Sequence, residues 1–427
     1  MSVSVIIGTQ FGDEGKGKLS DYLSSKSDIV VRFQGGDNAG HTVVNRLGAF
    51  KLHLTPCGIF RENTISLIGS GTVVNPDVLL EEIRMLESRG VITKNLRISS
   101  NANILMPYHV DLDNIFEAGN LSIGTTKRGV GPAYADKARR INIRFEDLID
   151  LDKLELKIEK ALSFVNKVLS SYNYDTYSIK EIFELCSTWS YEFRDKIVDS
   201  INLLHDALNQ DKEILFEGQL GVMKDIDFGI YPFVTSSHPI AAYASVSSGI
   251  PMNKFDNIIG VIKGFSSAVG EGPFPTEIKG EVAEQLRGTG ENIDDEFGVR
   301  TGRARRVGWL DIPSLRYANK INGFTQFALT KIDKLDRFSK IKICVAYMHK
   351  GKEYESIPSI SSLNNVKPIY EVIDGWNTST DKIRNYKNLP SKAKEYIKRI
   401  EKMVGVKIKY IANGPERENL IVRNELR

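Results

Sequence analysis

A glycine-rich turn directly after a short apolar segment constrains the fold of this chain more than any other feature. Residues 3–8 (VSVIIG) are largely β-branched and end at a glycine, and the turn GDEGKGK follows at residues 12–18. A strand, a glycine loop and a helix in this order expose backbone N–H groups where the helix dipole favours an anion. The sequence therefore predicts an α/β fold with a phosphate-binding loop.

This loop departs from the usual phosphate-loop signature, G-x-x-x-x-G-K-[ST], in which the hydroxyl after the lysine holds magnesium. Gly17 follows Lys16 here, and two carboxylates, Asp13 and Glu14, lie inside the loop. An ordinary tight turn with surface charges is the alternative. Four charged residues interleaved with three glycines favour phosphate binding instead, and they raise the question of what the acids do there.

The rest of the chain alternates between apolar, strand-like runs and amphipathic helices, which is typical of a parallel sheet covered on both faces. Further strands are expected within residues 28–36, 63–74, 213–221, 257–270, 324–336, 340–349 and 406–414, and helices at 75–90 and 389–405. We expect one elaborated, P-loop-NTPase-like α/β domain over residues 1–427, with a largely parallel central sheet flanked by helices. Residues from about 150 to 210 have helical periodicity and are predicted to form a helical insertion.

Composition excludes several classes of protein. The net charge is only +3 over 427 residues, which favours neither a nucleic-acid nor a membrane partner. No apolar run approaches the roughly 20 residues of a membrane span. Cys57, Cys186 and Cys344 are odd in number and lack metal-ligand spacing, so they are expected to be reduced thiols in a cytoplasmic protein.

A second glycine-rich turn, QGGDNAGHT at residues 34–42, leaves the next predicted strand and carries His41. Loops at the carboxyl ends of neighbouring parallel strands line one crevice, so His41 is expected to face the same ligand as Asp13. A lone histidine is more often structural. His41 lies between Gly40 and Thr42, where it has little core to pack into, and this favours a catalytic or ligand-binding role.

The segment TKID, residues 330–333, closes the run FTQFAL and is similar to the [NT]KxD element of guanine-nucleotide proteins. An ionised Asp333 carboxylate can accept two hydrogen bonds, from the N1–H and N2–H₂ groups of guanine. A match of four residues occurs easily by chance. The element therefore supports guanine-nucleotide binding only together with the phosphate loop.

Three further segments are polar and rich in glycine, arginine or hydroxyl groups: residues 123–140 (IGTTKRGVGPAYADKARR), 231–239 (YPFVTSSHP) and 301–306 (TGRARR). Arginine suits bidentate recognition of carboxylates and phosphates. A nucleic-acid patch or a solvated turn is the alternative for the arginine clusters, but aromatic residues are not interleaved with them.

Together, and in this order, these motifs closely resemble those of the adenylosuccinate synthetase family, the purine-pathway ligases. The resemblance covers nearly the whole chain, through GTQFGDEGKGK, RFQGGDNAGHT, GTTKRGVGPAYADKARR, FEGQLGVMKDIDFGIYPFVTSS, VGEGPFPTE, TGRARRVGWLD, LTKIDKLD and NGPER. It implies condensation of IMP with L-aspartate, driven by GTP with Mg²⁺, to give adenylosuccinate, GDP and phosphate. This is the first committed step of AMP synthesis from IMP. The resemblance also implies a cytoplasmic homodimer.

The resemblance implies an answer for the acids of the loop. Asp13 matches the base that takes the N1 proton of IMP, so that O6 attacks the γ-phosphorus of GTP and forms 6-phosphoryl-IMP. The aspartate amine then displaces the phosphate. Asp13 also matches a magnesium ligand, together with the backbone oxygen of Gly40, so no hydroxyl is needed after Lys16. His41 matches the acid that supports the transferring phosphoryl group.

By position, the GTP site is expected to include Gly12, Asp13, Glu14, Gly15, Lys16, Gly17, Lys18, Gly40, His41, Thr42, Arg305, Lys331, Ile332, Asp333, Ala412, Asn413 and Gly414. The IMP and aspartate sites are expected to include Asn38, Ala39, Thr126, Arg140, Gln219, Thr235, Val299, Arg300, Thr301, Gly302, Arg303, Ala304 and Arg305. Arg140 matches an arginine that reaches IMP from the other subunit. Residues 299–305 match the loop that closes on L-aspartate.

Two segments differ from the common family pattern. The family has glutamine directly before the last glycine of FEGxxG, where this chain has Leu220, and Gln219 lies one position earlier. Val299 and Arg300 stand where small or hydroxyl residues are frequent. Two other functions remain open at this stage: a regulatory GTPase switch with the same phosphate loop, and a nucleic-acid binder that uses the arginine clusters.

Overall fold

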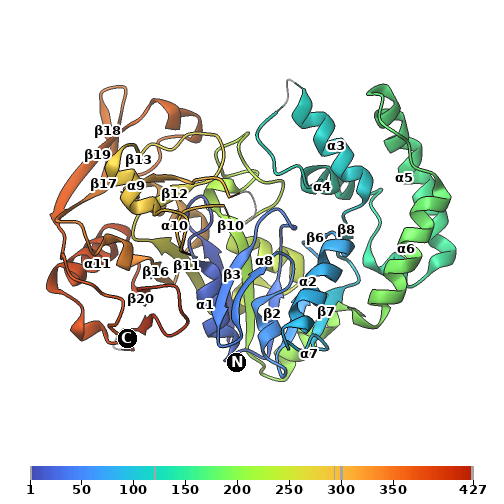
Figure 1. Cartoon of the computed structure of the whole chain (residues 1–427), viewed down its shortest axis with the longest axis horizontal. Helices are drawn as coiled ribbons and strands as arrows, with labels where there is room; N and C mark the ends of the chain where they lie inside the picture. The colour runs from blue at the N-terminus through green and yellow to red at the C-terminus, as the bar shows by residue number, and fades with distance from the viewer. Residues whose placement is uncertain (1, 120–121, 293, 299–301, 425–427) are drawn as a thin grey trace.

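A ten-stranded sheet runs through the centre of the chain (Figure 1). The structure is a computed structural model that describes residues 2–119, 122–292, 294–298 and 302–424. In spatial order the strands are β21 (Leu420–Val422), β20 (Ile408–Ala412), β16 (Gln326–Thr330), β11 (Asn257–Lys263), β1 (Val3–Gly8), β10 (Ile214–Gly221), β2 (Ile29–Arg32), β5 (Ile65–Ile68), β7 (Leu96–Ser99) and β9 (Ile197–Val198). Every neighbouring pair is parallel except β20 with β21. The predicted, largely parallel sheet is confirmed.

Both faces of this sheet are covered, because alternate residues of the central strand pack against different helices. Val5 and Ile7 share a core with α8 (Ala241–Ser248), α10 (Ile312–Asn322) and α11 (Ser391–Val404). Ile6 packs in a separate core with Leu19 of α1 (Lys16–Ser24). A strand that is buried on both faces has a continuous apolar sequence. For this reason β1 and the other central strands could be predicted from the sequence.

Smaller sheets lie around the central one. They comprise β12 (Ser266–Ala268), β14 (Arg306–Gly308) and β13 (Glu277–Ile278); β15 (Leu310–Asp311), β17 (Lys340–His349), β18 (Lys352–Tyr354) and β19 (Lys367–Asp374); the hairpin of β3 (His41–Asn45) and β4 (Gly48–Leu52); and the pair β6 (Val73–Val74) and β8 (Asn103–Ile104). The strand expected within residues 63–74 is therefore two strands, β5 and β6. A turn closed by the Thr72 N–H on the Gly69 carbonyl, 3.1 Å away, separates them.

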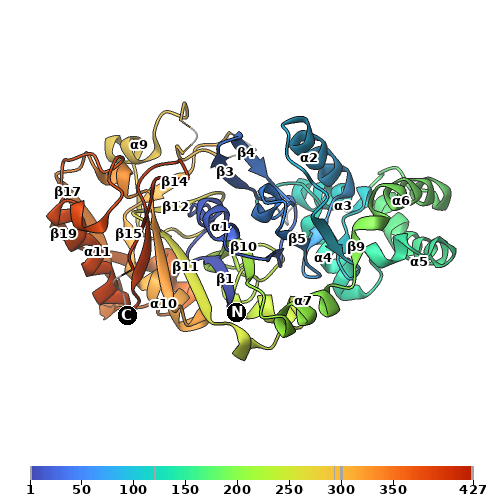
Figure 2. The same ribbon diagram turned by 90° about the horizontal axis from the view of Figure 1, so that it is seen from below.

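The predicted helical insertion is a pair of helices, α5 (Leu151–Ser171) and α6 (Ile179–Phe193), at one end of the molecule in both ribbon views (Figures 1 and 2). The last part of the predicted range returns to the central sheet, because β9 pairs with β7 and α7 (Ser200–Asn209) follows it. The remaining α-helices are α2 (Pro76–Ser88), α3 (Pro107–Ala118), α4 (Val130–Arg139) and α9 (Glu281–Arg287). Among the described residues, the structure contains no helix that is long and apolar enough to cross a membrane.

The topology gathers the predicted motifs at one edge of the sheet. The central strands β1, β2, β10, β11 and β16 are mutually parallel, so their carboxyl ends share an edge. The phosphate loop leaves β1, the second glycine-rich turn leaves β2, and TKID closes β16. Loops at such an edge form the binding crevice of open α/β sheets.

Candidate active site

The phosphate loop spans the end of β1 and the start of α1, and a buried acid sets its shape. Glu14 is 2% exposed, and its Oε1 accepts hydrogen bonds from the N–H groups of Gln10 (3.1 Å) and Gly12 (2.9 Å). Its Oε2 pairs with the Lys16 ammonium at 2.6 Å. Glu14 thus braces the loop from inside, whereas Asp13, with a φ of 57° that is uncommon outside glycine, lies on its open side.

The absence of a hydroxyl after Lys16 has a steric cause. Strand β3 passes directly over Gly17, so that a Cβ at this position would lie 2.7 Å from the Thr42 carbonyl oxygen and 3.1 Å from the His41 Cβ. Serine or threonine therefore does not fit. The space that the Ser or Thr side chain occupies in the usual motif is filled here by β3, the strand that carries His41.

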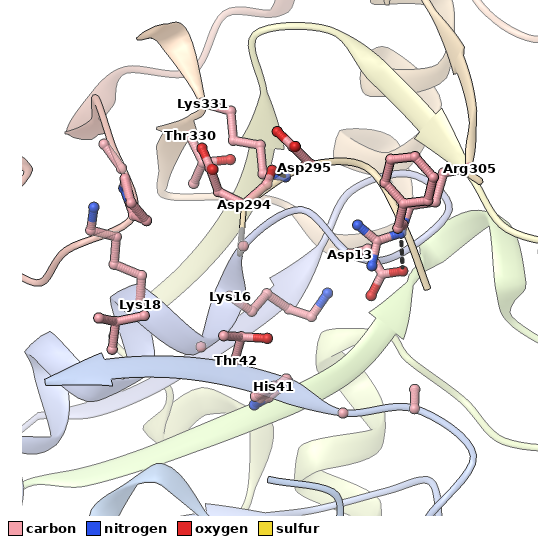
Figure 3. Close-up of a pocket in the computed structure, with 18 of the residues that line it drawn as sticks. Asp13, Lys16, Lys18, His41, Thr42, Asp294, Asp295, Arg305, Thr330 and Lys331 are labelled. Carbon is pink, nitrogen blue, oxygen red and sulfur yellow. Dashed lines mark hydrogen bonds and ion pairs between the residues drawn. The ribbon is translucent and has the colours of Figure 1, made fainter. Parts of the chain in front are cut away.

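Two neighbouring cavities open at this edge of the sheet. The first is lined by the phosphate loop, β3, the TKID segment and the segment around Gly414 (Figure 3), and the second by the segments around Thr126 and Thr235. The lining residues that both cavities share are Asp13, Ala39, Gly40, Leu220 and Arg305. A ligand in either cavity therefore lies against the same wall, which contains Asp13.

Most residues predicted for the nucleotide line the first cavity. These are Asp13, Gly15, Lys16, Gly17, Lys18, Gly40, His41, Thr42, Arg305, Lys331, Asp333, Ala412 and Gly414. Gly12, Glu14, Ile332 and Asn413 lie behind this surface. The Asn413 amide, for example, donates to the carbonyl oxygens of Thr380 and Ile383 and so joins the C-terminal loops to each other.

The two predicted phosphate-loop lysines both have protein partners. Lys16 pairs with Glu14, and Lys18 donates to the carbonyl oxygens of Gly414 and Asn419, the latter at 3.1 Å. Burial lowers the pKa of Lys18 to about 8. Lys18 thus connects the phosphate loop to the C-terminal segment as well as contributing charge to the cavity.

Of the residues predicted for IMP, Asn38, Ala39, Thr126 and Thr235 line the second cavity. Gln219 is 1% exposed and lines the first, but its amide is engaged with Gly36: Oε1 accepts from the Gly36 N–H (3.2 Å) and Nε2 donates to the Gly36 carbonyl (3.1 Å). Leu220, with a φ of 60°, lines both cavities. Gln219 therefore braces the second glycine-rich turn, and Leu220 is the one of the two residues that lines both cavities.

The predicted aspartate loop is described only at its ends, and Val299, Arg300 and Thr301 lie outside the described residues. Gly302, Arg303 and Ala304 are exposed. The Gly298 N–H donates to the Arg303 carbonyl and the Arg305 N–H to the Glu296 carbonyl, both at 2.8 Å. This pairing fixes the base of the loop beside the second cavity, which Gly298 and Arg305 line.

Arg140 lies apart from both cavities. It caps the C-terminus of α4 and lines a separate pocket with other basic side chains, namely Lys137, Arg144, Lys157 and Lys160. Arg140 is not among the residues that line the cavity that contains Thr126 and Thr235.

His41 is 6% exposed, and its ring lies over a buried polar cluster that the sequence did not reveal. Its Nδ1 is 3.8 Å from Glu217 Oε1 and 3.9 Å from Cys57 Sγ, while its Nε2 has no hydrogen-bond partner among the described residues. Burial, followed by the charges of Arg32 and Lys16, holds the pKa of His41 well below its usual range. The ring is therefore neutral at pH 7. The available signal for this cluster was an acid, Glu217, within an otherwise apolar strand.

Asp13 has a cationic partner on the shared wall. Arg305 Nε lies 3.0 Å from Asp13 Oδ2 (Figure 3). The Asp13 carboxylate and the Gly40 carbonyl are oxygen donors on the same wall. Oxygen ligands of this kind, one carboxylate together with substrate phosphates, are what Mg²⁺ prefers, so these residues fit a magnesium ion.

Asp333 lies at the far end of the first cavity. Its Oδ1 is buried without a hydrogen-bond partner in the described part of the chain. Burial, and then the charge of Asp294, raises the pKa of Asp333 to about 6. A buried carboxylate oxygen that lacks a partner is costly, and a donor from a ligand would relieve that cost.

Comparison with known proteins identifies the family to which this chain belongs. The sequence model described as Adenylosuccinate synthetase matches residues 5–421. The chain belongs to the adenylosuccinate synthetase family. The predicted resemblance is thereby confirmed, and the activity of this chain is that of the family: GTP-dependent ligation of IMP and L-aspartate to adenylosuccinate, in purine and AMP biosynthesis.

Individual relatives extend over the full length. Adenylosuccinate synthetase 1 of Methanosarcina acetivorans is 55% identical over 99% of this chain and 100% of its own length. The adenylosuccinate synthetase of Caldanaerobacter subterraneus subsp. tengcongensis is 46% identical over 99% of each. The solved structure of fully ligated adenylosuccinate synthetase from Plasmodium falciparum has a TM-score of 0.92 at 38% identity, and the match covers 99% of this chain and 100% of that one.

A more distant structure shares the fold alone. It is the succinoaminodeoxyadenylate synthetase of cyanophage S-2L, bound to dGMP and dATP, with a TM-score of 0.62 at 18% identity. The fold of the adenylosuccinate synthetase family is thus kept even where four-fifths of the residues differ.

Proposed function

We propose that the first cavity binds GTP, that the second binds IMP, and that L-aspartate is bound by residues 299–305. One observation carries this assignment: Asp13, Gly40 and Arg305 line both cavities. The phosphate loop and Asp333 lie on one side of this shared wall, and Asn38, Thr126 and Thr235 on the other. Phosphoryl transfer depends mostly on positioning and charge stabilisation, and the shared wall is where two bound nucleotides would meet.

In the proposed reaction, Asp13 takes the N1 proton of IMP, and the negative charge that results moves onto O6. O6 attacks the γ-phosphorus of GTP, which forms 6-phosphoryl-IMP and releases GDP. The amine of L-aspartate then attacks C6, the C6–O6 bond breaks, and O6 leaves as part of the phosphate. Asp13 is suited to the first step because its carboxylate faces the shared wall while Glu14, its neighbour, is turned into the loop.

Two further groups complete the proposed centre. His41 is neutral, and its unpartnered Nε2 is available to bind the transferring phosphoryl group. The Asp13 carboxylate and the Gly40 carbonyl would hold Mg²⁺, which neutralises charge that develops on the phosphates when it is bound. Arg305 places a further positive charge 3.0 Å from the Asp13 carboxylate.

Leaving out one substrate at a time distinguishes the proposed ligase from a regulatory GTPase. Phosphate release from GTP is measured with IMP and L-aspartate present, and then with each left out. The ligase requires both, so release should fall to background in either omission. Release that continues without IMP or aspartate would show that the phosphate loop serves simple GTP hydrolysis.

We also propose a homodimer in which Arg140 completes the IMP site of the neighbouring subunit. Its support is the position of Arg140, on a basic surface apart from the cavity that contains Thr126 and Thr235. A cytoplasmic location is proposed as well, because Cys57, Cys186 and Cys344 are all free thiols.

Arg140→Leu, purified alone, is expected to bind IMP poorly, and mixing it with Asp13→Asn is expected to restore part of the activity. A mixed dimer contains one site in which the intact Asp13 of one subunit meets the intact Arg140 of the other. The measurement is the rate of adenylosuccinate formation before and after mixing. Subunit exchange is verified separately with differently tagged chains, and no recovery after exchange would place Arg140 in its own subunit's site or in neither.

The KM for GTP is expected to rise as the pH falls through about 6, because the ionised form of Asp333 accepts the guanine N–H groups and its pKa is about 6. At one pH unit below the pKa, about a tenth of the carboxyl remains ionised, so KM should rise about tenfold between pH 7.5 and pH 5. Asp333→Asn cannot titrate and serves as the control for protonation of GTP itself. An equal pH dependence in the variant would contradict the role of Asp333.

A further inference from the structure

One buried carboxylate, that of Glu296, contacts three cations, and two of these, Arg305 and Lys331, line the first cavity. Glu296 is fully buried. Its Oε1 accepts from the ammonium groups of Lys331 (2.5 Å) and Lys263 (2.9 Å), and its Oε2 from Lys263 (2.8 Å) and Arg305 Nη1 (3.0 Å). Three cations from three separate segments of the chain therefore meet at a single side chain.

We propose that Glu296 is a positioning residue for the reaction: its carboxylate fixes Arg305 beside Asp13 and Lys331 beside the nucleotide base, and so joins the two ends of the nucleotide cavity. This inference rests on the proposed function. Glu296 itself lies behind the cavity surface, whereas Arg305 and Lys331 line it. Glu296 thus acts through these two residues.

Arg305 shows the geometric consequence most directly. Its guanidinium is shared between two acids, with Nη1 on Glu296 and Nε 3.0 Å from Asp13 Oδ2. Because Glu296 holds Nη1, Arg305 approaches Asp13 through Nε, at the Oδ2 oxygen of the carboxylate. Asp13 therefore keeps part of its carboxylate available for other partners.

Lys331 is restrained in the same way. Its backbone is left-handed, with a φ of 55°, and its ammonium donates to Glu296 and to the Asp294 carbonyl, the latter at 2.7 Å. These contacts hold the ammonium group of Lys331 at residues 294–296. Lys331, next to the proposed base-binding residue Asp333, is thus held by Glu296, the same carboxylate that restrains Arg305.

The charge balance of this cluster suits an anionic ligand. The three cations, Lys263, Lys331 and Arg305, face two carboxylates, those of Glu296 and Asp13, so one positive charge is in excess. Although burial opposes ionisation, Lys263, Lys331 and Arg305 hold the pKa of Glu296 well below its usual range. A nucleotide phosphate would offset the excess charge. Without Glu296 the excess doubles, and the guanidinium loses the contact that directs it.

A purely structural role is the alternative, since Lys263 is a buried residue of β11 that also donates to the Ser267 hydroxyl. The two roles differ in their kinetic signatures. A structural role lowers the folded or active fraction and reduces kcat alone, or changes all three substrate constants together. A positioning role through Arg305 and Lys331 acts mainly on GTP, because both residues line the first cavity. Arg305 also lies at the end of residues 299–305, so the KM for L-aspartate is expected to change as well. Asn38 and Thr235, proposed for IMP, line the second cavity, which Glu296 does not line.

The test compares Glu296→Gln with Glu401→Gln. Glu401 is a matched control, because it is also buried and paired with an arginine, Arg423, at 2.7 Å, but lies in α11. Initial rates are measured against GTP, IMP and L-aspartate, together with the melting temperature of each variant. For Glu296→Gln, kcat/KM for GTP should fall roughly 10- to 150-fold, the range for one hydrogen bond to a charged group. The KM for IMP should change less than about threefold, and Glu401→Gln should keep wild-type kinetics.

A double variant keeps the test decisive if Glu296→Gln alone does not fold. Glu296→Gln with Lys263→Met removes one negative and one positive charge, so the net charge of the cluster is unchanged, but Arg305 and Lys331 still lose their carboxylate. Its kcat/KM for GTP should remain low. Wild-type kinetics in the double variant, or equal changes in all three substrate constants, would overturn the proposal. Wild-type enzyme in the same assay shows independently whether phosphate release requires IMP and aspartate.

Discussion

Asp13→Asn lowers kcat by about 10²–10⁴-fold and leaves GTP binding largely intact, because a neutral amide cannot take the N1 proton of IMP. The side chain keeps its size, so the loop geometry set by Glu14 should persist. The loss of a magnesium ligand adds to the effect on kcat. The measurement is kcat with all three substrates, together with GTP affinity by equilibrium titration.

Asp256→Asn is a suitable control for this change. Asp256 accepts a hydrogen bond from the Val3 N–H at 2.8 Å, at the opposite end of β1 from Asp13. Its replacement tests the same chemical change at the same strand, away from both cavities, and kcat should stay near the wild-type value. Turnover of Asp13→Asn within a few-fold of wild type would remove Asp13 from the role of base.

Asp333→Asn should exchange the preference for GTP for a preference for XTP. The carboxylate is expected to accept two hydrogen bonds from guanine N1–H and N2–H₂, each worth ~1.5–3 kcal/mol when the partner is charged. Asparagine replaces one acceptor oxygen with an NH₂ donor. This donor opposes the N2–H₂ of guanine but complements the carbonyl oxygen at the same position of xanthine.

The measurement is kcat/KM for GTP and for XTP in both proteins, with the requirement for IMP and aspartate checked in each. The buried Oδ1 of Asp333, which has no partner among the described residues, is the structural reason to expect a large shift. An unchanged ratio of GTP to XTP would mean that Asp333 does not read the base.

The parts of this fold that follow from local chemistry were predictable from the sequence. The phosphate loop is a strand, a glycine turn and a helix that are contiguous in the chain, so its place was evident. The reason why no hydroxyl residue follows Lys16 was not predictable. The strand that excludes a side chain at Gly17 comes from residues 41–45, far from the loop in the sequence. A steric limit imposed by a distant segment leaves no local pattern.

The same reason explains why Glu296 was overlooked. In the segment NIDDEFG it is one of several acids, and nothing in its neighbours distinguishes a buried carboxylate from a solvated one. Its partners, Lys263, Arg305 and Lys331, come from β11, the start of β14 and the end of β16. Likewise, residues 197–209 have the periodicity of the helical insertion before them, but pairing of β9 with β7 returns them to the central sheet.

IMP labelled with ¹⁸O at O6 tests the proposed reaction most directly. The labelled IMP reacts with GTP and L-aspartate, and the phosphate released is analysed by mass spectrometry. Because O6 bonds to the γ-phosphorus and later leaves C6 with it, each phosphate should carry one ¹⁸O, and omission of aspartate should abolish labelled phosphate. Unlabelled phosphate formed together with adenylosuccinate would contradict attack by O6 and the role of the wall that the two cavities share.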